Sequence, residues 1–216
     1  MKRFIKLSIL GFIFSFTFSG CFLKSVHPLI SHSDSQRVEG LKGVWQDEDD
    51  ATWYFINDIT RFRQYMGMDE NPFADDQTID MQNAYFVFYE TKFNGRIDTT
   101  LFIGSTIELN DHYYLDLKVM EIGNGLPELV NSHLFAAHTF SKIAIRENEL
   151  TIELFNDEWI RDQLLNNRVR LKYERVDGEE PEVLVTATTK ELQEFVKKYG
   201  QNEKAYSDPL SLTRIK

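Results

Sequence analysis

Residues 112–119 read HYYLDLKV, and this stretch decides the fold class because its side chains alternate along the chain. A period of two places alternate side chains on opposite faces of a β-strand. The first set comprises Tyr113, Leu115, Leu117 and Val119, and the second comprises Tyr114, Asp116 and Lys118. The stretch therefore predicts a strand whose first set faces a hydrophobic core.

Turn signals that precede this stretch indicate that it is one strand of a sheet. Asn110-Asp111 precedes it, and Asn94-Gly95 is a strong two-residue hairpin signal further upstream. Similar runs along the chain give about nine or ten short strands, a spacing typical of an antiparallel barrel or sandwich. Ile59–Met66 also reads as a strand. We expect an all-β fold built as an antiparallel barrel of about 8–10 strands.

Two helices are expected late in the chain. Asn156 is a good N-cap, and the acidic residues after it suit a helix dipole, so a helix should run to about residue 166. Thr188 and Glu191 have the spacing of a capping box, and Gly200 suits a helix end. The apolar residues between them repeat with helical spacing: Leu192, Phe195, Val196 and Tyr199.

The composition of the chain excludes some classes of function and of binding site. The chain has 216 residues, a net charge of -10 and a sequence pI near 5.0, which argues against binding nucleic acid. Its single cysteine excludes an internal disulfide and a cysteine-based zinc cluster. The hydrophobic share of 42% is enough for one folded domain, which we place at residues 38–216.

The first twenty residues have the layout of a secretory signal peptide. Basic residues are followed by an apolar run from Leu7 to Phe18, too short to span a bilayer. Phe18-Ser19-Gly20-Cys21 resembles the lipobox of bacterial lipoproteins, in which the cysteine is lipidated and cleavage occurs just before it. The resemblance implies cleavage between Gly20 and Cys21, lipidation of Cys21 and a place in the bacterial cell envelope. The alternative is a plain signal peptide with a chance cysteine.

Residues 21–37 are expected to form the lipidated N-terminus and a flexible tether, because they are rich in serine and lack periodicity. Phe22, where an inner-membrane lipoprotein would have Asp, favours the outer membrane by resemblance to enteric sorting rules. An acidic body is repelled by anionic lipid, so we expect the body to hang from the membrane by its lipid.

Gly43-Val44-Trp45 resembles the Gly-x-Trp that opens the first strand of lipocalins. In that family the Trp plugs one end of an eight-stranded barrel, and an Arg from the last strand stacks on it. The resemblance implies a lipocalin-like barrel that is closed by Gly43, Trp45 and Arg214. The two helices and the long loop over residues 67–83 depart from the simple lipocalin plan.

Most of the chain also resembles a group of uncharacterised bacterial lipoproteins, which implies an envelope location and no particular activity. The matching stretches are His27-Pro28-Leu29, Gly43-Val44-Trp45, Trp53, Leu115-Asp116-Leu117, His138-Thr139-Phe140, Asp157-Glu158-Trp159, Leu184-Val185-Thr186-Ala187, and Thr189-x-Glu191-Leu192 with Phe195.

Aromatic clusters give the candidate ligand site. Apolar pockets are mostly lined by aromatic and aliphatic side chains. The candidate lining residues are Trp53, Phe55, Phe86, Phe88 and His138. The alternative is that the aromatic residues are packed core, and the sequence does not separate a filled barrel from a hollow one.

Catalytic signals are weak. The sequence has no nucleophile elbow, phosphate-binding loop or zinc-protease motif, so we expect no enzyme, no metal and no cofactor. The acidic run at residues 47–50 lacks the spacing of a calcium loop and is expected to be a hairpin tip.

Three functions remain open. The first is a lipid-anchored barrel that binds an apolar small molecule or an envelope protein without catalysis. The second is a solid-core interaction lipoprotein. The third is an envelope hydrolase that uses His138 with a nearby carboxylate.

Overall fold

The structure is a computed structural model that describes residues 22–70, 80–120, 135–176 and 182–216. The predicted signal peptide and Cys21 lie outside these ranges, as do His133 and part of the 67–83 loop. Among the described residues, no helix combines the length and the apolar character needed to cross a bilayer.

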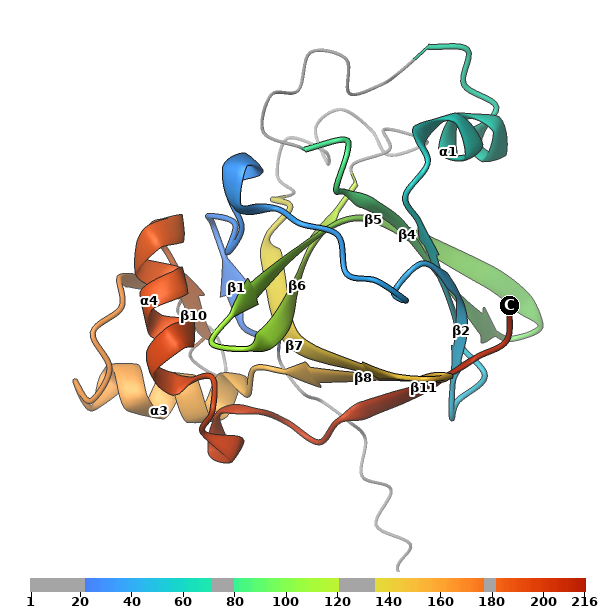
Figure 1. Cartoon of the computed structure of the whole chain (residues 1–216). Coiled ribbons are helices and arrows are strands. Elements are labelled where there is room, and N and C mark those ends of the chain that lie inside the picture. The colour runs from blue at the N-terminus through green and yellow to red at the C-terminus, as the bar shows by residue number, and fades with distance from the viewer. Residues whose placement is uncertain (1–21, 71–79, 121–134, 177–181) are drawn as a thin grey trace, which may run out of the picture.

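Eight antiparallel strands close into a barrel (Figure 1). They are β2 (Gly43–Asp47), β3 (Thr52–Ile56), β4 (Tyr85–Phe93), β5 (Arg96–Leu109), β6 (His112–Val119), β7 (His138–Arg146), β8 (Glu149–Leu154) and β11 (Leu210–Arg214). Strands β2 to β8 pair in chain order, and β11 completes the barrel between β8 and β2. The expected all-β antiparallel barrel is confirmed.

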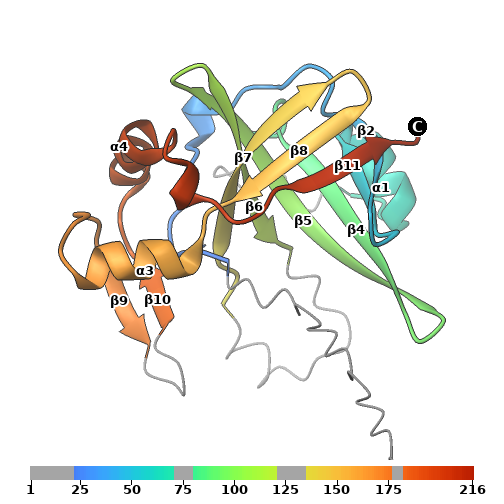
Figure 2. The ribbon, with the colours of Figure 1, turned by 90° about the horizontal axis from the view of Figure 1, so that it is seen from below.

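A second, smaller unit packs against one side of the barrel. Three short strands extend the sheet from β7 in the order β1, β10 and β9, where β1 is Lys24–Ser25, β9 is Tyr173–Val176 and β10 is Glu182–Val185. β1 runs parallel to β10, and β9 is antiparallel to it. Figures 1 and 2 show α3 (Asp157–Leu165) and α4 (Thr189–Tyr199) beside this small sheet.

Both late helices form as predicted. The Asn156 side chain accepts a hydrogen bond from the Trp159 amide at the start of α3. Thr188 and Glu191 make a complete capping box on α4, and Gly200 follows its last residue. Two 3-10 turns complete the described structure, at His32–Asp34 and Glu203–Ala205.

The strand expected over Ile59–Met66 is wrong, because this segment is the helix α1. The Asp58 side chain caps it by accepting hydrogen bonds from the amides of Thr60 and Arg61. Gly67 ends it in the left-handed conformation, with φ of 65°. Phe62 is its buried residue, so packing on the barrel outweighs the strand preference of the aromatic and β-branched side chains.

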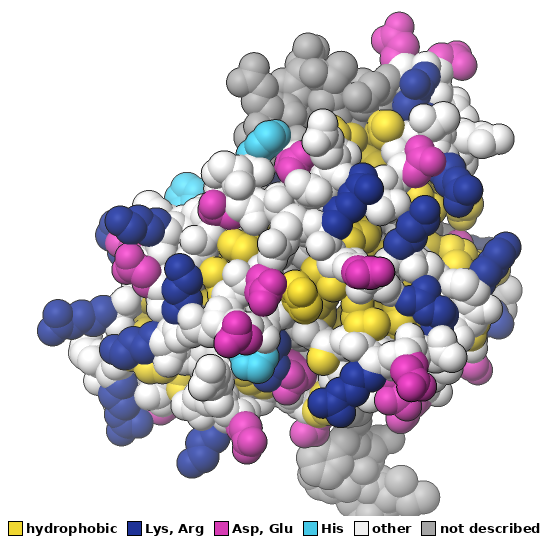
Figure 3. Space-filling view, viewed as in Figure 1, with side chains coloured by type: hydrophobic (Ala, Val, Ile, Leu, Met, Phe, Trp, Pro, Cys, Tyr) yellow, Lys and Arg dark blue, Asp and Glu magenta, His cyan; other side chains and the backbone are white. Residues whose placement is uncertain are grey.

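Large side chains fill the barrel interior, and hydrophobic side chains lie at its centre in Figure 3. One buried cluster contains residues from strands all round the barrel, including Trp45, Phe55, Tyr85, Leu115, Ile143 and Leu212. Trp53 packs against the same cluster. The barrel is therefore a packed core that acts as a scaffold.

Strand β6 differs in one respect from the pattern that predicted it. Leu115 points into the barrel cluster as expected, but Tyr113 is 38% exposed. Tyr114 and Asp116, expected to face solvent, are buried because the small unit covers the outside of this strand. The middle of β6 is thus covered on both faces.

Residues 22–37 also differ from the flexible tether expected from the sequence. Leu23 and Leu29 are buried in the core of the small unit, and β1 pairs with both β10 and β7. The Gln36 amide donates to the Thr106 carbonyl oxygen at 2.9 Å. Apolar burial and backbone pairing fix this segment, so the folded body begins at Phe22 and not at residue 38.

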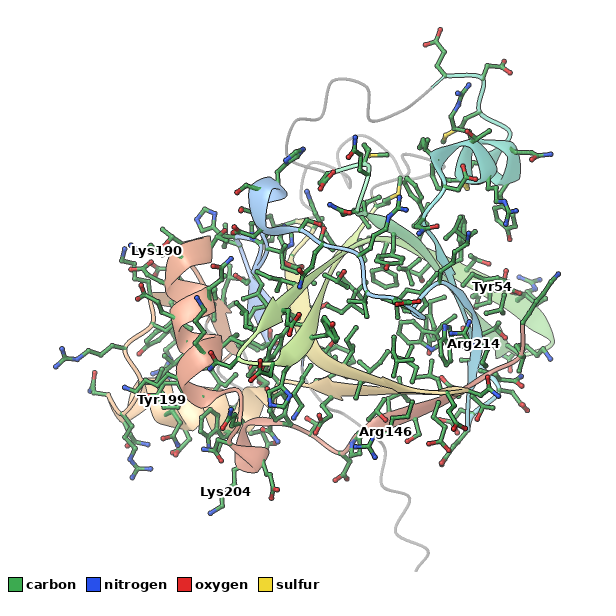
Figure 4. All side chains as sticks on the ribbon, in the orientation of Figure 1. Tyr54, Arg146, Lys190, Tyr199, Lys204 and Arg214 are labelled. Atoms are coloured by element: carbon green, nitrogen blue, oxygen red, sulfur yellow. The ribbon has the colours of Figure 1, made fainter. Side chains whose placement is uncertain are left out.

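Trp45 lies where the last strand meets the first. The Arg214 guanidinium carbon is 4.1 Å from the centre of the Trp45 ring, and the indole nitrogen donates to the Leu41 carbonyl oxygen at 2.9 Å. The same guanidinium donates to the carbonyl oxygens of Lys42 and Gly40. Figure 4 shows Arg214 on the β2 side of the barrel. The Arg214 side chain thus links the last barrel strand to the segment that leads into the first one.

Gly43 leaves room for this contact. Its φ is 151°, a conformation that favours glycine, and a Cβ there would collide with the Arg214 Nη1 atom. A side chain at this position would therefore displace the guanidinium from Trp45.

We predict that Gly43→Ala lowers the free energy of unfolding by about 2–4 kcal/mol, because it combines backbone strain with loss of the cation–π contact. Urea denaturation measures this loss. Gly95→Ala is the matched control, since Gly95 has φ of 74° and nothing within 4 Å of an added Cβ. The control should lose only the backbone cost, about 1–2 kcal/mol. Equal losses in the two variants would contradict a packing role for Gly43.

Candidate functional site

An apolar groove lies on the outer surface of the barrel, between α1 and strands β4 and β5. Its volume is about 430 Å³, and it is open to solvent on one side. The groove is lined by Tyr65, Met66, Phe88, Thr99, Thr100, Leu101 and Met120. Methionine and aromatic side chains make an adaptable apolar surface, and Thr99, on the same face of β5 as Leu101, adds a hydroxyl group.

Alternation along β4 builds the floor of this groove. Tyr85 and Val87 point into the barrel, so Phe86 and Phe88 point outward beneath α1. Phe62 of α1 stacks on Phe86 with ring centres 4.1 Å apart, which holds the helix on the sheet. Tyr65 meets Phe88 edge to face at 4.6 Å.

Glu90 is a carboxylate associated with the same outer surface. It accepts hydrogen bonds from the hydroxyls of Tyr54 at 3.1 Å and Tyr65 at 3.4 Å. Burial and the Glu90 carboxylate raise the pKa of both tyrosines, so both stay protonated near neutral pH. Figure 4 shows Tyr54 on the side of the barrel away from α3 and α4.

The candidate ligand-lining residues separate into three places. Trp53 and Phe55 belong to the barrel interior, while Phe86 and Phe88 belong to the outer cluster beneath α1. His138 belongs to neither cluster. Of the five, Phe88 lines the groove. Sequence reasoning missed Tyr65 and Met66 because it read their segment as a strand; Ile59, Phe62 and Met66 at helical spacing were the available signal.

His138 pairs with a buried carboxylate at the join between the barrel and the small unit. Its Nδ1 atom is 2.9 Å from Asp116 Oδ1, and the two side chains are 16% and 3% exposed. The second oxygen, Asp116 Oδ2, accepts the Leu29 amide at 2.6 Å. Both carboxylate oxygens are therefore engaged, and the pair fastens the N-terminal segment to β6 and β7.

Among the described residues, the hydrogen bond of the His138 ring goes to the Asp116 carboxylate. Within the described ranges, no serine, threonine or cysteine side chain hydrogen-bonds to the His138 ring. The same residues contain no group of three His, Cys, Asp or Glu side chains able to hold a metal ion. The geometry fits a structural link between two parts of the fold.

In the acidic run at residues 47–50, the Asp47 carboxylate also has a structural role. Its Oδ1 atom accepts the amides of Asp49 and Ala51, which shapes the turn between β2 and β3. Its Oδ2 atom accepts the Trp53 indole N–H at 3.4 Å. The carboxylate holds a hairpin tip, as the sequence indicated.

Comparison with known proteins leaves the fold and the geometry as the basis for function. No protein-family profile, curated protein or solved structure matches this chain.

We predict that Asp116→Ala destabilises the fold by about 2–3 kcal/mol, because it leaves the buried Leu29 amide without an acceptor. Hydrogen exchange gives a local readout: the Leu29 amide should exchange faster in this variant. His138→Ala is the control, since it preserves the bond between Asp116 and Leu29. Equal exchange at Leu29 in Asp116→Ala and in the unchanged protein would refute the link.

Proposed function

We propose that this chain is a non-catalytic, lipid-anchored protein of the bacterial envelope that binds an apolar small molecule on the outside of a solid barrel. The observation that supports this most directly is the groove beneath α1, an apolar concavity of about 430 Å³. The barrel supplies a rigid wall for it, and α1 supplies the other wall.

Packing argues for an outer site and against a site inside the barrel. The interior positions occupied by a ligand in a hollow barrel are here taken by side chains such as Trp45, Phe55 and Tyr85, each at most 1% exposed. A ligand in the interior would have to displace this core. The groove needs no such rearrangement, because its floor is already formed by Phe88 and Leu101.

The chemistry of the groove favours an apolar ligand with a small polar end. Met66, Met120 and Phe88 offer dispersion contacts to an alkyl or ring system. Thr99 is exposed on the strand position opposite Glu90, so its hydroxyl is available to hydrogen-bond a polar group. An acyl chain with a polar head has this chemistry.

A role without catalysis is consistent with the geometry of His138. Its imidazole is bound to a carboxylate that also holds the backbone of Leu29, and that arrangement orients the N-terminal segment. The proposal that the protein is not an enzyme rests on this use of the pair and on the lack of a catalytic sequence motif.

The anchor is proposed from the sequence of residues 18–21. The only cysteine of the chain lies at the position that lipidation requires, directly after a signal-like segment. Attachment to the outer membrane follows from the residue at position 22 by the sorting resemblance. The lipocalin-like character of the barrel is a proposal of the same kind, supported by the stacking of Arg214 on Trp45.

An envelope protein is the second candidate for the binding partner. The hairpin of β4 and β5 carries exposed residues at positions 96–100, and Ile97 is 63% exposed. An exposed isoleucine on a long hairpin suits contact with another protein.

We predict that Met66→Arg weakens binding of a fluorescent fatty acid at least tenfold, because the charge enters the apolar groove, and tenfold corresponds to about 1.4 kcal/mol. Fluorescence titration of the soluble body measures the Kd. Gln64→Arg is the matched control, since Gln64 is exposed on the same helix and does not line the groove.

An unchanged Kd in Met66→Arg would place the ligand elsewhere.

Native mass spectrometry separates the two candidates for the partner. Co-purified lipid mass favours the small molecule, whereas a bare protein that captures a specific envelope protein favours the alternative.

We predict that Cys21→Ala releases the protein from the membrane fraction and abolishes incorporation of labelled palmitate, because the cysteine sulfur carries the lipid. The measurement is radiolabelling with fractionation in the bacterial host. Palmitate labelling that persists in Cys21→Ala would contradict the anchor.

A further inference from the structure

The chain is held in the fold from its second mature residue onward. Phe22 forms a backbone bridge with Asn156, and Leu23 is buried beside the small unit. Lys24 and Ser25 then pair with Leu184 and Val185 of β10. No flexible stretch separates the lipidation position from the folded body after residue 21.

This geometry sets the distance between an anchor and the body. Adjacent Cα atoms are about 3.8 Å apart, so a lipid on Cys21 would attach one residue from the globule. A flexible tether of about sixteen residues would have allowed about 20–25 Å of separation. Given the proposed lipidation, on which this inference rests, the surface around Phe22 must lie at the bilayer.

The surface next to Phe22 is the open face of the small sheet. Phe22 is 51% exposed, and Lys24 is exposed two positions later, whereas Leu23 and Ser25 are buried on the other face. Val176 of β9 is 47% exposed and stands opposite Glu182 of β10. Two apolar side chains thus flank this end of the sheet.

Charge on this face is acidic overall, because the exposed Glu174 of β9 stands opposite Leu184 and shares the face of Val176 and Glu182. Lys24 and Glu182 form an ion pair at 2.7 Å, which leaves little net charge between Phe22 and Val176. Contact with lipid at this face would therefore be apolar, and anionic lipid would weaken it.

We propose that the open face of the small sheet, formed by Phe22, Lys24, Glu182 and Val176, lies against the membrane that holds the Cys21 lipid. Phe22 and Val176 enter the interfacial region, where apolar and aromatic side chains are stable. The helix α4 covers the other face of the small sheet, because its side chains Leu192 and Phe195 share one buried core with Val183 and Val185 of β10. This orientation holds the outer surface of α4 away from the lipid surface.

The test uses the full lipidated chain with one added cysteine, because the thioether at Cys21 leaves no other thiol. Val176→Cys is labelled with a fluorophore and reconstituted in phosphatidylcholine vesicles, with and without headgroup spin-labelled lipid. Lys190→Cys is the control, an exposed position on α4, which packs against the other face of the small sheet. Circular dichroism confirms that both variants fold.

We expect spin-labelled lipid to quench the fluorophore several-fold more at position 176 than at position 190. Inserting sixteen Gly and Ser residues between Cys21 and Phe22 should reduce this difference. Equal quenching at the two positions in a chain that floats with the vesicles refutes the docked face alone. A chain that does not float with the vesicles refutes the lipid anchor, and the docked face with it.

Discussion

The stacking of Arg214 on Trp45 is the contact on which the barrel depends. A closed sheet must join its first strand to its last, and here one guanidinium spans that seam while bonding two backbone carbonyl oxygens before β2. Trp45 is fully buried in the interior cluster, so the ring that Arg214 stacks on is also part of the barrel core. The filled interior then leaves the outer surface for binding.

The outer surface of the barrel is covered in two separate ways. Beneath α1, Phe86 and Phe88 of β4 and the aliphatic residues Leu101 and Ile103 of β5 form a cluster that remains open at one edge. Around Tyr114 and Asp116, the N-terminal segment, α3, α4 and the small sheet form a closed second core. One side of the barrel therefore serves stability and the other presents a concavity, which is the division that the proposed function uses.

Local signals in the sequence predicted the turns, caps and strands whose formation depends on residues close together in the chain. The turn at Asn94-Gly95, the capping box of Thr188 and the strand over residues 112–119 all formed as expected. The sequence could not show which face of β4 points into the barrel, because Phe86 and Phe88 alternate with equally apolar neighbours. It also missed α1 and the packing of residues 22–37, whose order comes from contacts with distant parts of the chain. The groove was missed for the same reason.

The parallel pairing of β1 with β10 has a consequence for the timing of biogenesis. Lys24 and its partner Glu182 are 158 positions apart, so the edge of β1 that pairs with β10 stays open until nearly the whole polypeptide has been synthesised. Before that point, β7 is the strand that can pair with β1. Once β10 pairs with it, β1 becomes an internal member of the sheet, so the small unit is completed late in synthesis.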